Sequence, residues 1–392
     1  MDEDSKKEAS TIKRIAEQWR KSLEGVKEVE FIDDQDEKSE LERFLSRLTN
    51  ELSPPQNNLN ECSRSRSFFP SFLHDHEYQV AQRLKKQLLA EYHGVFLEDI
   101  FPGIEIETDD GPCFNIQSQE KVVFNVFSQN QTRNKILSDL KLIYGIGKVK
   151  EQKLKVEGYR SIEDLVDHPR FGSTASDFLI PFIEKDYNTI VKQVIDCYWV
   201  SSSHPLFFYS SGFFQKENFA IIDIETLGLF SRPIILFGIA KVRDSSIEVN
   251  QLLLRDVEEE PAALRVVQNL LDEETIFISY NGRSFDVPYI NQRLAFYGIN
   301  PSFNNLHFDL LHFARRAWKD LVPNCQLTTL EEHLLNIHRE NDVPSALIPD
   351  FYDTYRQENN IGPLVPIIKH NKQDLMSLAY LFSKLQEEWE ND

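Results

Sequence analysis

The stretch Ile221–Leu229 reads IIDIETLGL and places two carboxylates inside an apolar run. With Phe219 and Ala220 before it, the run has the composition of a buried β-strand. Residues at i and i+2 of a strand point to the same face, so Asp223 and Glu225 are predicted to project together from the strand's end. Burying even one unpaired carboxylate costs several kcal/mol. The stretch therefore predicts either a cation that compensates both charges or a segment that is not a buried strand.

Around this stretch the sequence has the pattern of a mixed α/β layer fold. Apolar strands are predicted at 219–223, 234–242 and 275–280, and they alternate with helical patterns as far as the C-terminus. Composition and turn-rich stretches predict four parts. They are a charged, partly disordered N-terminal arm at 1–62 with a helix over 37–52, a small α+β segment at 70–130, a mainly helical region at 132–200, and an α/β domain at 213–392.

Composition bounds the class of protein. The 392 residues, 41% hydrophobic and 11% aromatic, are typical of a soluble globular protein with two or three domains. The formal net charge of −20 argues against broad, nonspecific binding to polyanions, unless the charge is locally reversed. The four cysteines are far apart and indicate neither a zinc site nor a disulfide framework. Without an apolar leader or a run of about 18 apolar residues, the sequence predicts a cytoplasmic protein with no membrane span.

A local reversal of charge occurs at Leu140–Lys150, which reads LKLIYGIGKVK. Between Arg133 and Arg160 eight Lys and Arg stand against three Asp and Glu, a net of +5. Gly-Ile-Gly at the join of two short helices permits a tight turn and leaves backbone N–H groups free at the second helix, a geometry that suits a phosphate. The alternative is a plain turn between helices or a protein contact. The residues that would bind nucleic acid are Gly145, Gly147, Lys148 and Lys150.

Two further carboxylates stand where they could complete a site with Asp223 and Glu225. Asp286 follows a short apolar strand and a polar loop, and Asp374 is predicted at the opening of an amphipathic C-terminal helix. His370 precedes Asp374 by four residues and so shares its helix face. Carboxylate oxygens are the preferred ligands of hard divalent cations such as Mg²⁺ and Mn²⁺.

Each of these features has a plainer alternative. The DxE pair could be a loop or helix-cap feature, Asp286 an ordinary N-cap, and His370 with Asp374 a surface pair. Asp309, in HFDLL, is either an accessory acid or the N-cap of the following helix. The conjunction of the four acids, in order and on suitable elements, favours the metal site.

These stretches together resemble the DEDD exonuclease group of the ribonuclease-H-like superfamily, most closely its YprB-type branch, preceded by a helix-hairpin-helix motif. The matching stretches are DIETLGL, PIILFGIA, SYNGRSFDVPYINQRL, HFDLLHFARRAWK, LTTLEEHLLNIHRENDVPS and HNKQDLMSLAYL. The resemblance implies a ribonuclease-H-like mixed sheet flanked by helices. It also implies that Asp223, Glu225, Asp286 and Asp374 hold two divalent metal ions, Mg²⁺ or Mn²⁺.

The resemblance implies a metal-dependent 3′→5′ exonuclease that hydrolyses DNA or RNA by a two-metal mechanism. In the DEDDh branch the histidine precedes the last aspartate by five residues, and in the DEDDy branch a tyrosine precedes it by four. Here His370 stands at the tyrosine spacing, as in YprB-type domains, so it acts as the general base or instead steadies a water or a phosphate. Asn281 and Arg283 either orient the substrate strand or shape the loop before Asp286.

Two other functions stay open at this point. One is a catalytically idle nucleic-acid-binding or scaffold protein that keeps the fold. The other is a structure-specific endonuclease in which the hairpin selects junctions or flaps. In each case the partner is DNA or RNA, and the acidic arm at 1–62 is a candidate contact for protein partners.

Overall fold

The computed structural model describes residues 75–228, 231–243, 245–300, 303–339 and 342–390. The N-terminal arm, with the helix predicted over 37–52, lies outside these residues. Within these ranges there is no helix that combines the length and the apolar character needed to cross a membrane.

A seven-stranded mixed sheet organises the described chain, in the order β1-β2-β5-β4-β3-β6-β7. Strand β3 pairs antiparallel with β4 and parallel with β6, which in turn pairs parallel with β7. The mixed sheet flanked by helices that the sequence predicts is thereby confirmed. The strands are β1 (Gly103–Thr108), β2 (Gly111–Lys121), β3 (Phe219–Thr226), β4 (Ile234–Arg243), β5 (Ser246–Leu253), β6 (Ile276–Ser279) and β7 (His307–Asp309).

The segment 70–130 contributes to this same sheet. Its helices α3 (Asp75–Glu91) and α4 (Leu97–Ile100) are followed by the hairpin of β1 and β2, and β2 pairs antiparallel with β5 along eight residues. The part predicted at 70–130 therefore shares one sheet with the part predicted at 213–392. Composition could not reveal this, because β2 and β5 are separated by more than 100 residues.

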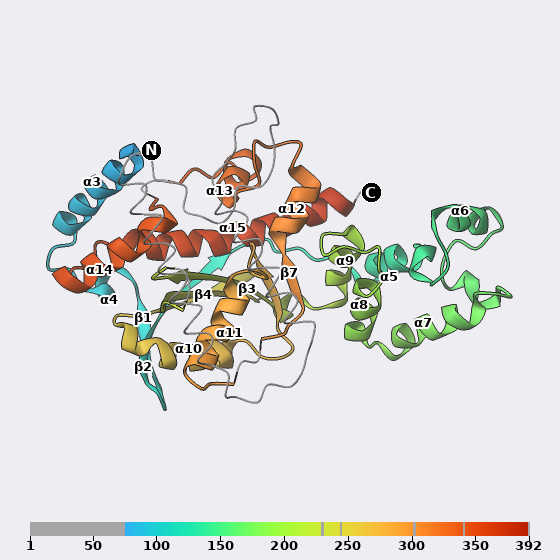
Figure 1. Ribbon diagram of the computed structural model, residues 1–392, viewed down its shortest axis with the longest axis horizontal. Helices are drawn as coiled ribbons and strands as arrows, with labels where there is room; N and C mark the ends of the chain where they lie inside the picture. The colour runs from blue at the N-terminus through green and yellow to red at the C-terminus, as the bar shows by residue number, and fades with distance from the viewer. Residues whose placement is uncertain (1–74, 229–230, 244, 301–302, 340–341, 391–392) are drawn as a thin grey trace, which may run out of the picture. The chain divides into compact units, whose positions relative to one another are not determined.

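Successive residues of β3 alternate between two hydrophobic cores. Ile222 and Ile224 pack in the core of α10 (Glu260–Leu270) and α11 (Asp286–Phe296). Ile221 packs in the other core, with Leu375 and Leu378 of α15 (Leu364–Glu390). By the same alternation Asp223 and Glu225 point toward α15. Figure 1 shows α15 crossing the sheet near β3 and β4.

The remaining helices form one group before β3 and another after β7. Phe207 of α9 stacks on Phe308 of β7, with ring centroids 4.8 Å apart, so the helical region shares the α15-side core. The helices of this region are α5 (Gln129–Leu137), α6 (Lys148–Val156), α7 (Gly172–Glu184), α8 (Tyr187–Ile195) and α9 (Pro205–Tyr209). Toward the C-terminus follow α12 (Leu310–Trp318), α13 (Leu327–Leu330), a π-helical turn (Glu331–Leu335) and α14 (Ile348–Glu358).

A buried ion pair fixes α10 against α11. Arg293 Nε donates to Glu260 Oε1 at 2.8 Å, and Glu260 also accepts the backbone N–H of Ile234 at 2.9 Å. The side chains are 3% and 0% exposed. Removing the cation alone leaves a buried, uncompensated carboxylate.

We expect Arg293→Met to lower the free energy of unfolding by ~3–5 kcal/mol, the usual loss when one partner of a buried pair is removed. Denaturant unfolding measures it. Adding Glu260→Leu to the variant should recover part of the loss, and a single variant as stable as the wild type would contradict the prediction.

Candidate active site

The carboxyl end of β3 supplies the first two acids. Asp223 lies beside Gly238 of β4 in the sheet register, and Glu225 beside Leu236. Glu225 is buried, at 7% exposure, and Asp223 is partly buried. The strand assignment of Ile221–Leu229 thus holds as far as Thr226, where the pairing with β4 becomes irregular. Two acids buried in this way require a cation nearby or a raised pKa.

Asn371 of α15 fixes the orientation of Asp223. Its side-chain amide donates to Asp223 Oδ2 at 2.7 Å and to the backbone carbonyl of Asp223 at 3.2 Å. The amide of Gln251 on β5 in turn donates to Asn371 Oδ1 at 2.8 Å. A Cβ at Gly238 would lie 2.3 Å from Asn371 Oδ1, so glycine lets this side chain reach the sheet. Asn371 and Gln251 were not identified from the sequence; only the position of Asn371, beside His370, offered a signal.

Asp286 reaches the cluster from the first residue of α11. Its Oδ1 accepts the backbone N–H of Ile224 at 3.1 Å, and the residue is 6% exposed. It is therefore not the N-cap of α11, a position held by Phe285 without a side-chain cap. A Cβ at Gly282 would lie 2.3 Å from Ser279 Oγ and 3.1 Å from Asp286 Oδ2, so only glycine fits under this loop.

Asp309 holds the loop before Asp286 through backbone contacts. Its carboxylate accepts the N–H of Asn281 at 2.8 Å and that of Arg283 at 3.2 Å. It also accepts the N–H of Leu311 at 3.2 Å and caps α12, which is the plainer of the two alternatives for this residue. Asn281 has a positive φ of 67°. The backbone of Asn281 and Arg283 thus shapes the loop, while a role of either side chain in orienting a substrate stays a prediction.

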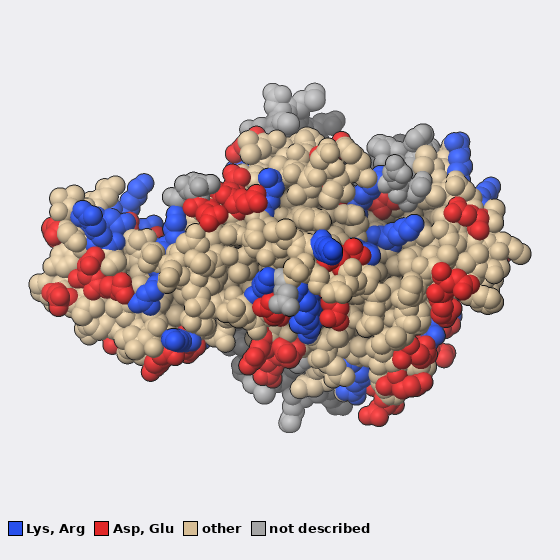
Figure 2. Space-filling view, turned by 180° about the vertical axis from the view of Figure 1, so that it is seen from behind, with Lys and Arg blue, Asp and Glu red and all other residues tan. Residues whose placement is uncertain are grey.

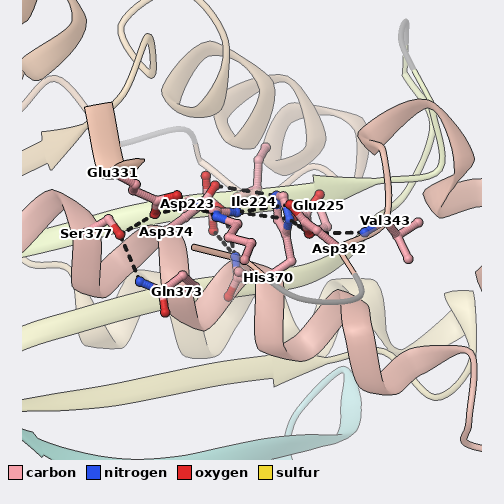
Figure 3. A network of polar contacts seen from close by, with 12 residues as sticks. Asp223, Ile224, Glu225, Glu331, Asp342, Val343, His370, Gln373, Asp374 and Ser377 are labelled. Atoms are coloured by element: carbon pink, nitrogen blue, oxygen red, sulfur yellow. Dashed lines mark hydrogen bonds and ion pairs between the residues drawn. The ribbon is translucent and has the colours of Figure 1, made fainter. Parts of the chain in front are cut away.

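Helix α15 brings His370 and Asp374 to the same cluster. The helix begins at Leu364, so both residues lie inside it rather than at its opening. His370 Nε2 lies 3.6 Å from Asp374 Oδ2 and 3.9 Å from Glu225 Oε1. The two side chains are 13% and 14% exposed, which excludes a solvated surface pair. Figure 3 shows Asp223, Glu225, His370 and Asp374 converging from β3 and α15.

The four acids resist ionising together. Burial, followed by the charges of Asp374, Glu225 and Asp286, raises the pKa of Asp223 well above its usual value. Burial raises the pKa of Glu225 to about 8 and that of Asp286 to about 7, although the charge of His370 acts against the first shift and backbone hydrogen bonds against the second. Burial also raises the pKa of Asp374 despite the charges of His370 and Arg339. Such shifts are typical of functional sites.

His370 is held as a cation within this cluster. Burial alone would lower its pKa, but the hydrogen bond to Asp342 and the charges of Asp374 and Glu225 outweigh burial and raise the pKa to about 9. The Nδ1 atom lies 2.5 Å from Asp342 Oδ1. The role of His370 as the general base stays a prediction, because it requires that the histidine first lose this proton. Asp342 was not identified from the sequence.

Arg339 is the second internal cation, and the sequence assigned it no role. Its guanidinium is only 10% exposed and contacts both Glu331 and Asp374. Burial alone would lower the pKa of Arg339, but the hydrogen bond to Glu331 and the charge of Asp374 outweigh burial and raise that pKa above its usual value. Glu331 is likewise a residue that sequence reasoning missed, although both stand in the stretch LTTLEEHLLNIHRENDVPS that carries the resemblance.

The carboxylate oxygens of the four acids are the kind of ligand that a hard divalent cation prefers. The four acids supply carboxylate oxygens from three elements, β3, α11 and α15, and their charges are only partly offset by His370 and Arg339. Among the described residues, no three His, Cys, Asp or Glu side chains stand together as a ready-formed metal site. Asp374 contacts both internal cations, and Glu225 faces His370. Asp223 and Asp286 instead accept hydrogen bonds from Asn371 and from the backbone of Ile224.

The hairpin residues lie apart from the four acids. A 3₁₀ turn, Leu140–Leu142, takes the place of the first short helix, and Gly147 is the N-cap of α6. Gly145 has a φ of +86°, and the Lys150 ammonium donates to its carbonyl. Lys148 is exposed. Figure 2 shows a patch of Lys and Arg at the end that carries α6, with Asp and Glu side chains beside it.

The chain is similar to the uncharacterized protein YprB of Bacillus subtilis strain 168, with 30% identity over 260 residues, covering 59% of this chain and 61% of the relative. Among solved structures it is similar to a family B DNA polymerase of the archaeon Pyrobaculum calidifontis, with a TM-score of 0.34 and 14% identity over 43% of this chain and 24% of the polymerase. The family model described as the RNase H superfamily matches residues 220–386. The matched residues include all four acids and His370.

Proposed function

We propose that the protein is a metal-dependent nuclease, a 3′→5′ exonuclease acting on DNA or RNA. The observation that carries the proposal is the convergence of Asp223, Glu225, Asp286 and Asp374, whose mutual repulsion is only partly compensated. A protein without a use for a bound cation has no physical reason to hold four such carboxylates together.

The four carboxylates would hold two divalent ions, Mg²⁺ or Mn²⁺, which when bound activate a water and stabilise the leaving 3′ oxygen of the scissile phosphate. Asn371 holds Asp223 in one orientation, and the backbone N–H of Ile224 does the same for Asp286. Protonated His370 balances the charges of Glu225 and Asp374. Its prediction as the general base requires that it first lose its proton.

A cavity of about 280 Å³ borders the cluster at His370, Arg339 and Asp342, although none of the four acids lines it. His370, Arg339 and Asp342 form one wall, and Leu84 and Leu88 of α3 form another. Helix α3 is fixed there because the Lys85 ammonium and the Gln82 amide both bind Asp350, at 2.6 and 2.9 Å. The cavity thus combines charged side chains with apolar ones, and a nucleotide carries both a charged phosphate and an apolar base.

A product ladder tests the proposed function. Single-stranded, duplex and flap substrates of DNA and RNA, labelled at the 5′ or the 3′ end, are incubated with Mg²⁺, with Mn²⁺ or with EDTA. An exonuclease of this polarity gives a 5′-labelled ladder that shortens one nucleotide at a time. Cleavage only at flaps or junctions would favour the structure-specific endonuclease, and binding without any cleavage would favour the idle scaffold.

The hairpin is proposed to hold nucleic-acid phosphates through Gly145, Gly147, Lys148 and Lys150. Gly147→Glu tests it, because Gly147 has a negative φ of −101° and a Cβ there meets nothing within 4 Å. The added carboxylate at the start of α6 should leave the fold intact but weaken binding about tenfold, since hydrogen bonds to charged groups contribute ~1.5–3 kcal/mol each.

Fluorescence anisotropy with a labelled oligonucleotide measures this affinity. Val156→Glu is the matched control: it adds the same charge to the far end of α6, where Val156 is 89% exposed. Equal affinity of the two variants would contradict a phosphate contact at the hairpin.

A further inference from the structure

Glu331 is a fully buried carboxylate that the proposed chemistry does not use. It is 0% exposed and lies in the π-helical turn Glu331–Leu335. Arg339 Nε donates to its Oε2 at 2.6 Å and Arg339 Nη2 to its Oε1 at 2.6 Å, so the guanidinium is bound by both carboxylate oxygens. This arrangement holds a planar guanidinium in one orientation, which a lysine could not reproduce.

Helix α15 fixes Glu331 in turn. The Ser377 hydroxyl donates to Glu331 Oε1, and the Gln373 amide donates to Ser377 Oγ at 2.9 Å. Both residues stand on the helix that carries His370 and Asp374 (Figure 3). The position of the guanidinium is therefore set by the same helix that supplies the last acid of the cluster.

Arg339 uses its remaining donors on the cluster itself. Nη2 also donates to Asp374 Oδ1, while Asp374 Oδ2 faces His370 Nε2 at 3.6 Å. Nη1 lies 3.6 Å from Asp342 Oδ2, and the other oxygen of Asp342 binds His370 Nδ1. Because His370 Nδ1 donates to Asp342, the 3.1 Å approach of Arg339 Nη1 to the same nitrogen brings two donors together and is not a hydrogen bond between them.

We propose that Glu331 and Arg339 are positioning residues that orient Asp374 and, through Asp342, His370 for the cation that the acids bind. Glu331 fixes the orientation of the Arg339 guanidinium and also neutralises its charge. Arg339 can therefore hold one oxygen of Asp374 without adding net positive charge beside the bound cation. The inference rests on the proposed function, because it assigns these residues to the same metal-binding cluster.

Two effects of Glu331→Gln act in the same direction. The variant keeps the volume of the side chain but loses one of the two oxygens that bind Arg339, so the guanidinium and Asp374 become less well oriented. It also leaves the positive charge of Arg339 unbalanced beside the cluster. Outer partners of metal ligands typically contribute ~10–100-fold to metal affinity, so a loss in this range is expected.

Titration calorimetry with Mn²⁺ on the full chain tests the inference, with thermal unfolding in EDTA as the second readout. The matched control is Glu260→Gln, which weakens another buried carboxylate–arginine pair. Glu260 contacts Arg293, Ile234 and Tyr297. Both variants should unfold at a lower temperature than the wild type. Only Glu331→Gln should lose Mn²⁺ affinity, and equal affinity of the two variants would overturn the inference.

Arg339→Lys is the second test, and it decides the matter if Glu331→Gln does not fold. It keeps the charge but not the planar fork, so its Mn²⁺ affinity should also fall; an affinity equal to the wild type would overturn the inference. A wild-type protein that binds no Mn²⁺ would overturn the proposed function and this inference together. Wild-type binding with an unchanged Glu331→Gln would overturn the inference alone.

Discussion

Asp223→Asn is expected to abolish metal-dependent release of nucleotides while the fold survives. The substitution keeps the shape of the side chain and removes the charge from the acid that Asn371 and the end of β3 hold in place. Bound metal ions contribute several kcal/mol to stabilising the charge of the transition state, and each 1.4 kcal/mol is tenfold in rate, so a loss of about 10³-fold or more follows.

The measurement is the initial rate of product release with Mn²⁺, beside thermal unfolding of the same sample in EDTA. Glu248→Gln is the matched control, since Glu248 is a half-buried acid of β5 in the same sheet, and the rate of this variant should equal that of the wild type. Because Asp223 is repelled by three other carboxylates, Asp223→Asn should not lower the unfolding temperature in EDTA. Full activity in this variant, or full activity of the wild type in EDTA, would contradict the assignment of the site.

The period of two along β3 was sufficient to predict where the first two acids point. Alternation from Ile221 places Asp223 and Glu225 on one face, and the structure has them facing α15. The helical period likewise predicted that His370 and Asp374 share a face, since side chains four residues apart are neighbours. Local periodicity determines such relations, and these could be inferred from the sequence without knowing the fold.

The supporting contacts could not be inferred, because they join residues that only the fold brings together. Asn371 lies 148 residues from Asp223, and Gln251 lies 120 residues from Asn371. Each is a single polar side chain with no periodic pattern around it. The pKa of His370 is a further example, because its direction depends on Asp342, Asp374 and Glu225 together rather than on the histidine itself.

The second large effect concerns stability without metal. Glu225→Gln is expected to unfold at a higher temperature than the wild type at pH 8 in EDTA, and the difference should vanish near pH 4.5. Burial raises the pKa of Glu225 from 4.5 to about 8 in the folded protein. An acid with a raised pKa is harder to ionise in the folded state, so it has no cost below pH 4.5 and its full cost above pH 8. Each kcal/mol corresponds to ~2–4 °C for a domain of 150–250 residues.

The difference between variant and wild type is the quantity to measure, because other groups act on the absolute curve. Burial lowers the pKa of His204 to about 4 and that of His307 to about 3, so both contribute stability that is lost as the pH falls below 6.5. These contributions are the same in both proteins and cancel in the difference. Scanning calorimetry at intervals from pH 4.5 to pH 9 supplies it.

Asp342→Asn provides a control of opposite sign beside the same histidine. The hydrogen bond and charge of His370 outweigh burial and lower the pKa of Asp342, so its carboxylate stabilises the fold above pH 3.8 and that stability is lost as the pH falls. Asp342→Asn should therefore unfold at a lower temperature than the wild type at pH 8, where Glu225→Gln unfolds at a higher one. If both substitutions lowered the unfolding temperature at pH 8, the two acids would be equivalent structural partners of His370.

Adding Mn²⁺ at pH 8 should narrow the difference in unfolding temperature between Glu225→Gln and the wild type. A ligand that binds only the folded state stabilises it by ~2.7 kcal/mol at 100 times its dissociation constant, and this gain requires ionised carboxylates. The wild type then gains stability from the same charge that destabilises it in EDTA, while Glu225→Gln gains less. A cluster kept only for the fold would show the EDTA difference at every metal concentration, so a decrease of that difference as Mn²⁺ is added separates a binding site from a structural group of acids.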